Sequence, residues 1–152
     1  MSAAVTHVLA PCAGGVVPVT AVPDPVFSAE MVGPGVAIDP GTDVVTVLAP
    51  VGGRLVKLHP HAFVLLTDGG VGVLVHLGID TVRLEGRGFE VLAAEGDTLA
   101  AGDPVVRWDP TTVEEGMSTL VPVVVMDRPA GSVPAPAADL VVAAGDPLFE
   151  VP

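Results

Sequence analysis

The chain has 152 residues, half of them hydrophobic, and its 16 prolines and 18 glycines divide the apolar residues into short runs. No run reaches the roughly 20 residues of a spanning helix, and the start, MSAAVTHVLAP, lacks the pattern of a signal peptide. The net charge of −12, without a Lys/Arg cluster, excludes nucleic-acid binding and suits a basic protein partner. One cysteine excludes an internal disulfide. We expect a free-standing cytoplasmic protein with one domain, residues 1–152, and no stable membrane insertion.

Valine-rich runs between Gly, Pro and Asp predict an all-β protein with little helix. In chain order the predicted strands are residues 43–50, 53–59, 62–67, 71–79, 103–108, 119–127, 138–144 and 147–151. A short helix is predicted directly after Asp109, which can cap it. Pro110 suits its first position, and Glu114 and Glu115 lie near its start.

Two motifs occur twice in the chain. VLAPCAGGVVPV (residues 8–19) matches VLAPVGGRLVKL (residues 47–58), and AAGDPVV (residues 100–106) matches AAGDPLF (residues 143–149). The first motif predicts a strand, a Pro-Gly turn and a second strand, and the other predicts a turn entering a strand. The repetition favours an antiparallel β-sandwich of two similar layers, although the shared Ala/Val/Gly/Pro composition alone could produce such matches.

Three of the four histidines lie in HPHAFVLLTDGGVGVLVHLGID, which is otherwise mostly apolar. The segment TDGG predicts a β-hairpin, because Asp-Gly favours a two-residue turn. With Asp68 and Gly69 at its centre, His61 stands directly opposite His76 on one face of the sheet. A turn at Gly69-Gly70 would make the two histidines diagonal neighbours, and only a three-residue loop would place them on opposite faces.

Two further residues accompany this pair. His59 shares the face of His61 if the strand continues through Pro60, but proline confines the strand there to an edge or a beginning. Asp80 follows His76 by four residues, at the point where the strand leaves the sheet.

The paired imidazoles favour phosphoryl transfer. A neutral imidazole nitrogen can attack phosphorus while its other nitrogen is held by a hydrogen bond, and a second imidazole can donate to the phosphoryl oxygens. Either His76 or His61 could be the nucleophile, with the other as its helper. An apolar rim would exclude water from the labile N–P bond. The candidate rim residues are Phe63, Leu74, Val75 and Leu77.

Other chemistries remain as alternatives. His59, His61, His76 and Asp80 have the ligand types of a zinc site, so a zinc-dependent hydrolase on a duplicated β fold is the rival interpretation. No H-E-x-x-H motif supports it. A biotin- or lipoate-type carrier is excluded because the only lysine, Lys57, falls inside a predicted strand. Cys12 matches Val51 in the repeat and is interpreted as a small apolar filler.

The chain resembles the glucose-type enzyme IIA of the bacterial sugar phosphotransferase system over nearly its whole length. The matching segments are VLAPCAGG, VPDPVFSAEMVGPGVAIDP, VLAPVGG, HAF, VHLGIDTV and GMSTLVPVVV. The resemblance implies a β-sandwich phosphocarrier without a cofactor. It implies a phosphoryl donor, the histidine phosphocarrier protein (HPr), and an acceptor, a cysteine on an EIIB domain of a sugar permease. Whether that sugar is glucose or N-acetylglucosamine is left open.

The resemblance also implies roles for individual residues. His76 matches the phosphorylated histidine and His61 the supporting one, with no metal required, although the pair could act as adventitious zinc ligands. Asp24 and Asp80 match acidic residues that meet a basic residue of the phosphocarrier. The matches to the family's apolar docking surface are Val26, Phe27, Leu74 and Leu77. His59 stands where family members commonly carry a threonine, so it either replaces that threonine as an accessory residue or is merely exposed.

Overall fold

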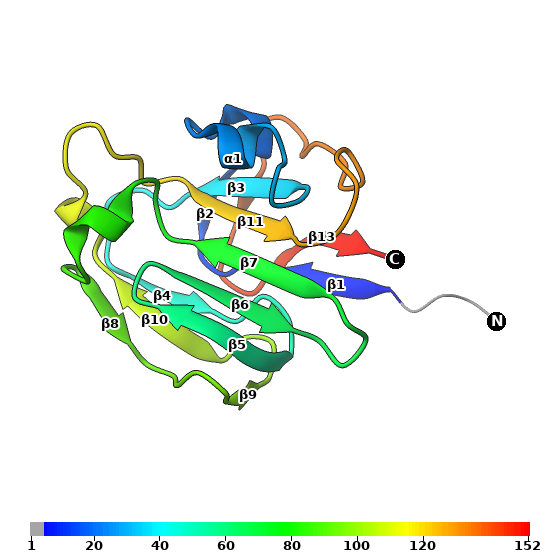
Figure 1. The fold of residues 1–152 in the computed structure, drawn as a ribbon. Coiled ribbons are helices and arrows are strands. Elements are labelled where there is room, and N and C mark those ends of the chain that lie inside the picture. The colour runs from blue at the N-terminus through cyan, green and yellow to red at the C-terminus, as the bar shows by residue number, and fades with distance from the viewer. Residues whose placement is uncertain (1–4) are drawn as a thin grey trace.

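The structure, a computed structural model, describes residues 5–152. Its strands form three antiparallel sheets. The largest sheet has eight strands in the order β12-β2-β3-β11-β7-β6-β5-β9 (Figure 1). Its strands are β2 (Gly14–Pro18), β3 (Gly35–Asp39), β5 (Gly53–His59), β6 (Ala62–Leu66), β7 (Gly72–His76), β9 (Thr98–Leu99), β11 (Val121–Val125) and β12 (Val141–Val142).

Two smaller sheets cover the inner face of the large one. The first pairs β1 (Thr6–Leu9) with β13 (Pro147–Val151), and the second has the order β4 (Val45–Leu48), β10 (Pro104–Trp108) and β8 (Phe89–Val91). Four short helical segments complete the described residues: η1 (Val19–Ala21), α1 (Pro25–Ser28), η2 (Thr81–Leu84) and η3 (Pro110–Thr112). The all-β class with little helix is therefore confirmed.

The repeated motifs correspond to two similar halves, which meet where β7 pairs with β11. Counted inward from the two edges of the eight-stranded sheet, the strands of one half match those of the other: β12 matches β9, β2 matches β5, β3 matches β6, and β11 matches β7. The hydrogen bonds repeat as well. Leu9 N–H donates to the Pro50 carbonyl at 2.8 Å, and Leu48 N–H donates to the Pro11 carbonyl at 2.8 Å. The repetition in the sequence therefore reflects structure and not composition alone.

The main core fills the space between the large sheet and the two smaller ones. Trp108, Phe63 and Leu65 are among its largest fully buried side chains, and valines from both halves surround them. Alternation along each strand sends every second residue into this core and the others to the outer face of the sheet. On β7, Val73 and Val75 point inward, so Leu74 and His76 point outward.

The outer face is covered over one half of the sheet only. A second apolar cluster packs η1 and α1 against β3 and β11, with Val19, Phe27, Ala37 and Val124 among its buried members. In Figure 1, α1 lies over β3 and β11, whereas β7, β6 and β5 face the viewer without a covering element. The covered half therefore stabilises α1, and the open half leaves the outer side chains of β5, β6 and β7 accessible to a partner.

The predicted strands are confirmed at each position, with the segment at 138–144 reduced to the two residues of β12. Three strands, β3, β8 and β9, and the helix α1 were not predicted. They are short, and tertiary pairing rather than a long periodic pattern holds them in place. The predicted cap at Asp109 is present, since its Oδ1 accepts from Thr111 N–H at 3.0 Å. The helix ends at Thr112, so the expectation that Glu114 and Glu115 lie near its start is wrong.

Candidate functional site: three imidazoles on an open sheet face

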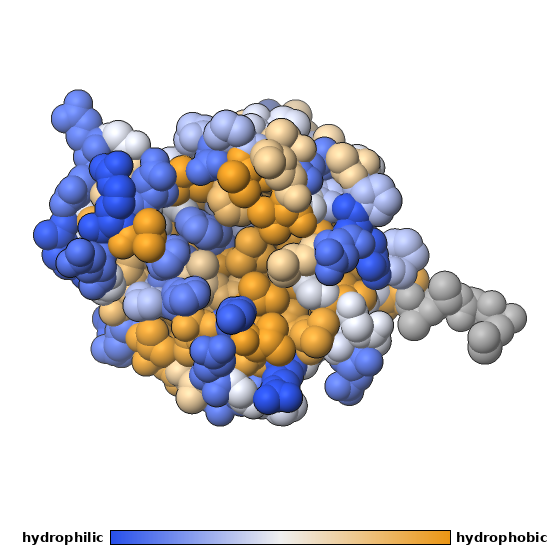
Figure 2. All heavy atoms as spheres, viewed as in Figure 1, coloured by the Kyte–Doolittle hydropathy of each residue, from blue (hydrophilic) through white to orange (hydrophobic). Residues whose placement is uncertain are grey.

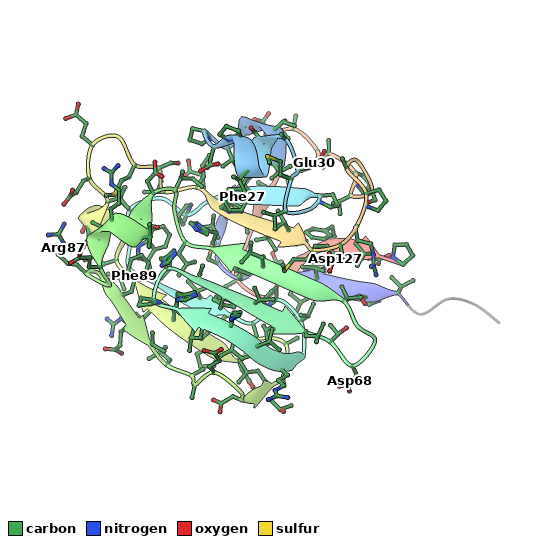
Figure 3. The ribbon with its side chains drawn as sticks, in the orientation of Figure 1. Phe27, Glu30, Asp68, Arg87, Phe89 and Asp127 are labelled. Atoms are coloured by element: carbon green, nitrogen blue, oxygen red, sulfur yellow. The ribbon has the colours of Figure 1, made fainter. Side chains whose placement is uncertain are left out.

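The hairpin of β6 and β7 has a three-residue loop, Asp68–Gly70. Thr67 N–H donates to the Val71 carbonyl at 2.9 Å, and Gly70 takes a φ of 86°, a conformation that glycine adopts at little cost. Asp68 lies at the loop tip (Figure 3). The register pairs His76 with Ala62, not with His61. The predicted two-residue turn, and with it the directly opposed histidine pair, is wrong.

The two imidazoles nevertheless meet. His61 lies in a two-residue turn with Pro60 between β5 and β6, so strand alternation does not dictate the direction of its side chain. Its ring centroid is 5.2 Å from that of His76, with the planes at 76° in an edge-to-face arrangement. The backbone of His61 is held next to the end of β7, because its carbonyl accepts from Leu77 N–H at 2.7 Å.

His59 completes a row of three imidazoles. The register places His59, Ala62 and His76 side by side on β5, β6 and β7, all on the outer face. The centroids of His59 and His61 are 5.8 Å apart and their planes differ by 27°, so these two rings are stacked. The ring of His61 therefore lies between those of His59 and His76.

The hydrogen bond of His76 determines which of its nitrogens is free. Its Nδ1 lies 2.5 Å from the carbonyl oxygen of Gly78. A carbonyl oxygen can only accept, so Nδ1 carries the proton and Nε2 of the neutral ring keeps its lone pair. Burial lowers the pKa of His76, while the Gly78 hydrogen bond and the charges of Asp24 and Asp80 act in the opposite direction. The ring is therefore neutral at rest, yet its surroundings favour a positive charge when one develops.

His61 is strongly biased toward its neutral form. Burial, followed by the like charges of His76 and His59, lowers the pKa of His61 from 6.5 to about 4. A neutral imidazole has one N–H to donate, which suits contact with an anionic group between the two rings.

The backbone after β7 is held so that the Gly78 carbonyl meets His76. Gly78 has a φ of 83°, and a Cβ built on it would lie 2.5 Å from Thr81 Cγ2 and 2.8 Å from the Ser118 carbonyl oxygen. Thr81 is fully buried, and its hydroxyl donates to the Leu77 carbonyl at 2.6 Å. These supporting roles were not predicted. The G-x-D-T pattern after His76 was visible, but the pairing of Ile79 with Ser118, which is distant in the chain, was not.

An apolar wall and two carboxylates flank the rings. Phe27 projects from α1 toward the sheet (Figure 3), and its ring centroid is 5.2 Å from that of His76. Asp24 caps α1 by accepting from Val26 N–H at 2.9 Å, which holds the carboxylate near the site. Asp80 is exposed directly after the Gly78 turn. Figure 2 shows apolar surface across the middle of this face, interrupted by hydrophilic groups.

The predicted docking residues differ in their exposure. Val26 is 42% exposed and Leu74 is half-buried, whereas Phe27 is buried at 6% exposure. Leu77 is 0% exposed and belongs to the main core, because it continues the alternation that also points Val73 and Val75 inward. Its proposed place on the docking surface is therefore wrong.

The described residues offer no metal centre: within residues 5–152, no group of three or more His, Cys, Asp or Glu side chains is arranged to hold a metal ion. The zinc-hydrolase interpretation thus lacks a ligand set among these residues. None of the helices in the same part of the chain has the length and apolarity to cross a membrane.

A neutral imidazole with one nitrogen tethered and the other free, beside a second imidazole on an open β-sheet face, has the chemistry that a histidine phosphocarrier requires. The family model described as "phosphoenolpyruvate-dependent sugar phosphotransferase system, EIIA 1" matches residues 6–130. The chain belongs to this family and is a phosphotransferase component of the sugar phosphotransferase system.

Relatives and solved structures agree with this assignment. The glucose-specific EIIA component of Bacillus cereus is 40% identical over 126 residues, which cover 81% of this chain and 75% of the relative. The corresponding component of Staphylococcus aureus is 43% identical over 104 residues, 67% of this chain and 61% of the relative. The structure of glucose permease IIA from Mycoplasma capricolum matches with a TM-score of 0.86 and 34% identity, over 97% of this chain and 96% of that one.

Proposed function

We propose that Nε2 of His76 is the atom that accepts and releases the phosphoryl group. The observation that carries this proposal is the 2.5 Å contact between His76 Nδ1 and the Gly78 carbonyl oxygen, which leaves Nε2 as the free nucleophile. His61 lacks such a tether among the described residues, so it is the poorer candidate for the nucleophile.

In the first transfer, the lone pair of His76 Nε2 attacks the phosphorus of a phosphohistidine on HPr. The new N–P bond forms as the donor's N–P bond breaks, and the donor nitrogen keeps the electron pair of the broken bond. The attack draws electrons from the His76 ring, which becomes positively charged. The Gly78 carbonyl, Asp24 and Asp80 favour that charge.

In the second transfer, a cysteine thiolate of an EIIB domain attacks the same phosphorus, and the His76–phosphorus bond breaks. His76 recovers its lone pair and its neutral ring. His61 donates its N–H to the phosphoryl oxygens in both steps, and so spreads the charge that develops on them. The sugar would then be phosphorylated by the permease, and this site does not identify that sugar.

The docking surface we propose comprises Asp24, Val26, Phe27, Leu74 and Asp80. The carboxylates suit a basic partner, in keeping with the net charge of −12. The apolar side chains would exclude water from the N–P bond once a partner is bound. Since the donor takes its phosphoryl group from phosphoenolpyruvate, a cytoplasmic metabolite, we assign the reaction to the cytoplasm.

The test is phosphorylation from phosphoenolpyruvate through enzyme I and HPr, followed by mass mapping at alkaline pH, where phosphohistidine survives. We expect phosphate on His76 in the wild type and none on the His76→Gln variant. The His61→Gln variant should still accept phosphate but transfer it slowly. His7→Gln is the matched control, because His7 is exposed on β1 and pairs with Glu150 instead. Phosphate on another residue of the wild type would refute the proposal.

A further inference from the structure

The imidazole of His61, the proposed hydrogen-bond donor to the phosphoryl group, contacts the rings of His59 and His76. Among the described residues, no side-chain or backbone group forms a hydrogen bond with the ring nitrogens of His61, whereas Nδ1 of His76 is tethered to Gly78. The His61 side chain also starts from a turn residue and not from a strand. Its orientation therefore depends on packing against His76 on one side and His59 on the other.

The contact between His59 and His61 is suited to fix that orientation. Their centroids are 5.8 Å apart with an interplanar angle of 27°, so a ring face of His59 lies against His61. His59 is the last residue of β5 and pairs across the ladder with Ala62, whose methyl group leaves room for the His61 ring on the outer face. Without His59, the His61 ring has solvent on that side and gains rotamers that point away from His76.

We propose that His59 is a positioning residue, which holds the His61 ring against His76 by stacking on the side away from the nucleophile. This inference rests on the proposed function, in which His76 carries the phosphoryl group and His61 donates to its oxygens. His59 touches neither the phosphorus nor the attacking nitrogen. Its effect is exerted through His61, by limiting the orientations available to the donor before the partner arrives.

The inference predicts which kinetic quantity changes. A misaligned donor weakens stabilisation of the transition state and lowers the rate of transfer within the complex, whereas a lost docking contact raises KM. Because aromatic contacts of this kind contribute modestly, we expect a change of roughly twofold to tenfold in kcat. The KM for the partner protein should stay the same.

Three variants of His59 separate stacking from other roles. His59→Ala removes the ring, His59→Gln retains a polar side chain without an aromatic face, and His59→Phe retains the face without a titratable nitrogen. His59 is exposed, so we expect all three to fold, and thermal unfolding checks that they do. His7→Ala is the matched control, since it removes an exposed histidine of β1, which belongs to a different sheet from the row.

The measurements are single-turnover transfer from phosphorylated HPr to each variant, and steady-state transfer onward to EIIB. We expect His59→Ala and His59→Gln to lose roughly twofold to tenfold in kcat, and His59→Phe and His7→Ala to match the wild type. If all His59 variants match the wild type, if His59→Phe is as slow as His59→Ala, or if only KM changes, the inference is overturned. Phosphate mapped to His76 in these samples would show that the proposed function stands when this inference fails.

Discussion

The Nδ1 atom of His76 lies 2.5 Å from the carbonyl oxygen of Gly78, two residues further along the chain. This contact links the chemistry of the site to the conformation of one turn. Gly78 has a φ of 83°, and its carbonyl can reach back to the His76 ring because the chain leaves β7 in that conformation. Changes to the turn should therefore affect the imidazole without touching it.

Gly78→Ala should lower both stability and phosphorylation. The new Cβ would lie 2.8 Å from the Ser118 carbonyl oxygen in a backbone conformation that costs alanine about 1 kcal/mol. We expect a loss of about 2–4 kcal/mol in the free energy of unfolding, together with slower phosphorylation of His76. Denaturant unfolding and phosphotransfer assays measure the two effects.

Gly70→Ala is the control for this prediction. Gly70 has a similar φ of 86°, but a Cβ there would meet nothing within 4 Å. It should lose only about 1 kcal/mol and keep full phosphorylation. Equal effects of the two substitutions would contradict the role assigned to the Gly78 turn.

The low pKa of His61 should make stability depend on pH. Below 6.5 the unfolded chain binds a proton at this residue, and the folded protein does not until the pH falls to about 4. Stability from this group is therefore full above pH 6.5 and declines as the pH falls from 6.5 toward 4. Urea unfolding at several pH values should show a smaller decline over this window for His61→Gln than for the wild type. A His61 ring that titrates near 6.5 in an NMR experiment would rule out this prediction.

The ring of Phe27 should protect the phosphoryl group on His76 from water. Phe27→Ala removes a side chain that is 6% exposed and should cost about 3–5 kcal/mol of stability. Phe27→Leu keeps most of the burial, at a cost below about 1.5 kcal/mol, but loses the aromatic contact with His76. We expect the phosphorylated Leu variant to hydrolyse faster than the wild type, as measured by loss of phosphohistidine with time. An unchanged half-life would show that the Phe27 ring does not shield the phosphoryl group.

The two roles of Asp24 should be separable by substitution. Asp24→Asn can still accept from Val26 N–H and cap α1, so only the charge is lost. We expect slower association with the basic donor at low salt and a smaller difference at high salt, where screening weakens the attraction. Asp24→Ala should in addition lose about 1 kcal/mol of stability through the missing cap. An association rate of Asp24→Asn that falls short of the wild-type rate equally at low and high salt would contradict the electrostatic role in docking.

The β-rich class, the duplicated motifs and the cluster of histidines could be predicted from local patterns. Valine-rich runs between turn residues occur at the observed strands, and Asp109 and Pro110 mark the start of η3. The strands β3, β8 and β9 lack such signals because their stability comes from neighbours distant in the chain. The helix α1 is only four residues long and depends on burying Phe27 against the outer face of the sheet.

The sequence predicted that His76 and His61 are neighbours, but the predicted geometry, a directly opposed cross-strand pair, is wrong. The local chemistry of the segment TDGG allows either a two-residue or a three-residue turn. A register shift of one residue moves every side chain of a strand to the opposite face of the sheet. The inward burial of Leu77, in contrast, follows from the alternation along β7, in which Val73, Val75 and Leu77 point to the core and Leu74 and His76 point outward.

The amino-acid sequence by itself determined the residue types at the site, the β-strand periodicity and the repetition that generates two similar halves, because these depend on side-chain chemistry and local backbone preference. Tertiary structure alone decided that His61 leaves a turn to meet His76, that His59 stacks behind it, and that the Gly78 carbonyl selects Nε2 as the free nitrogen. Those relationships join β5, β6, β7 and the segment containing Ser118, and only the packing of the complete sheet brings these elements together.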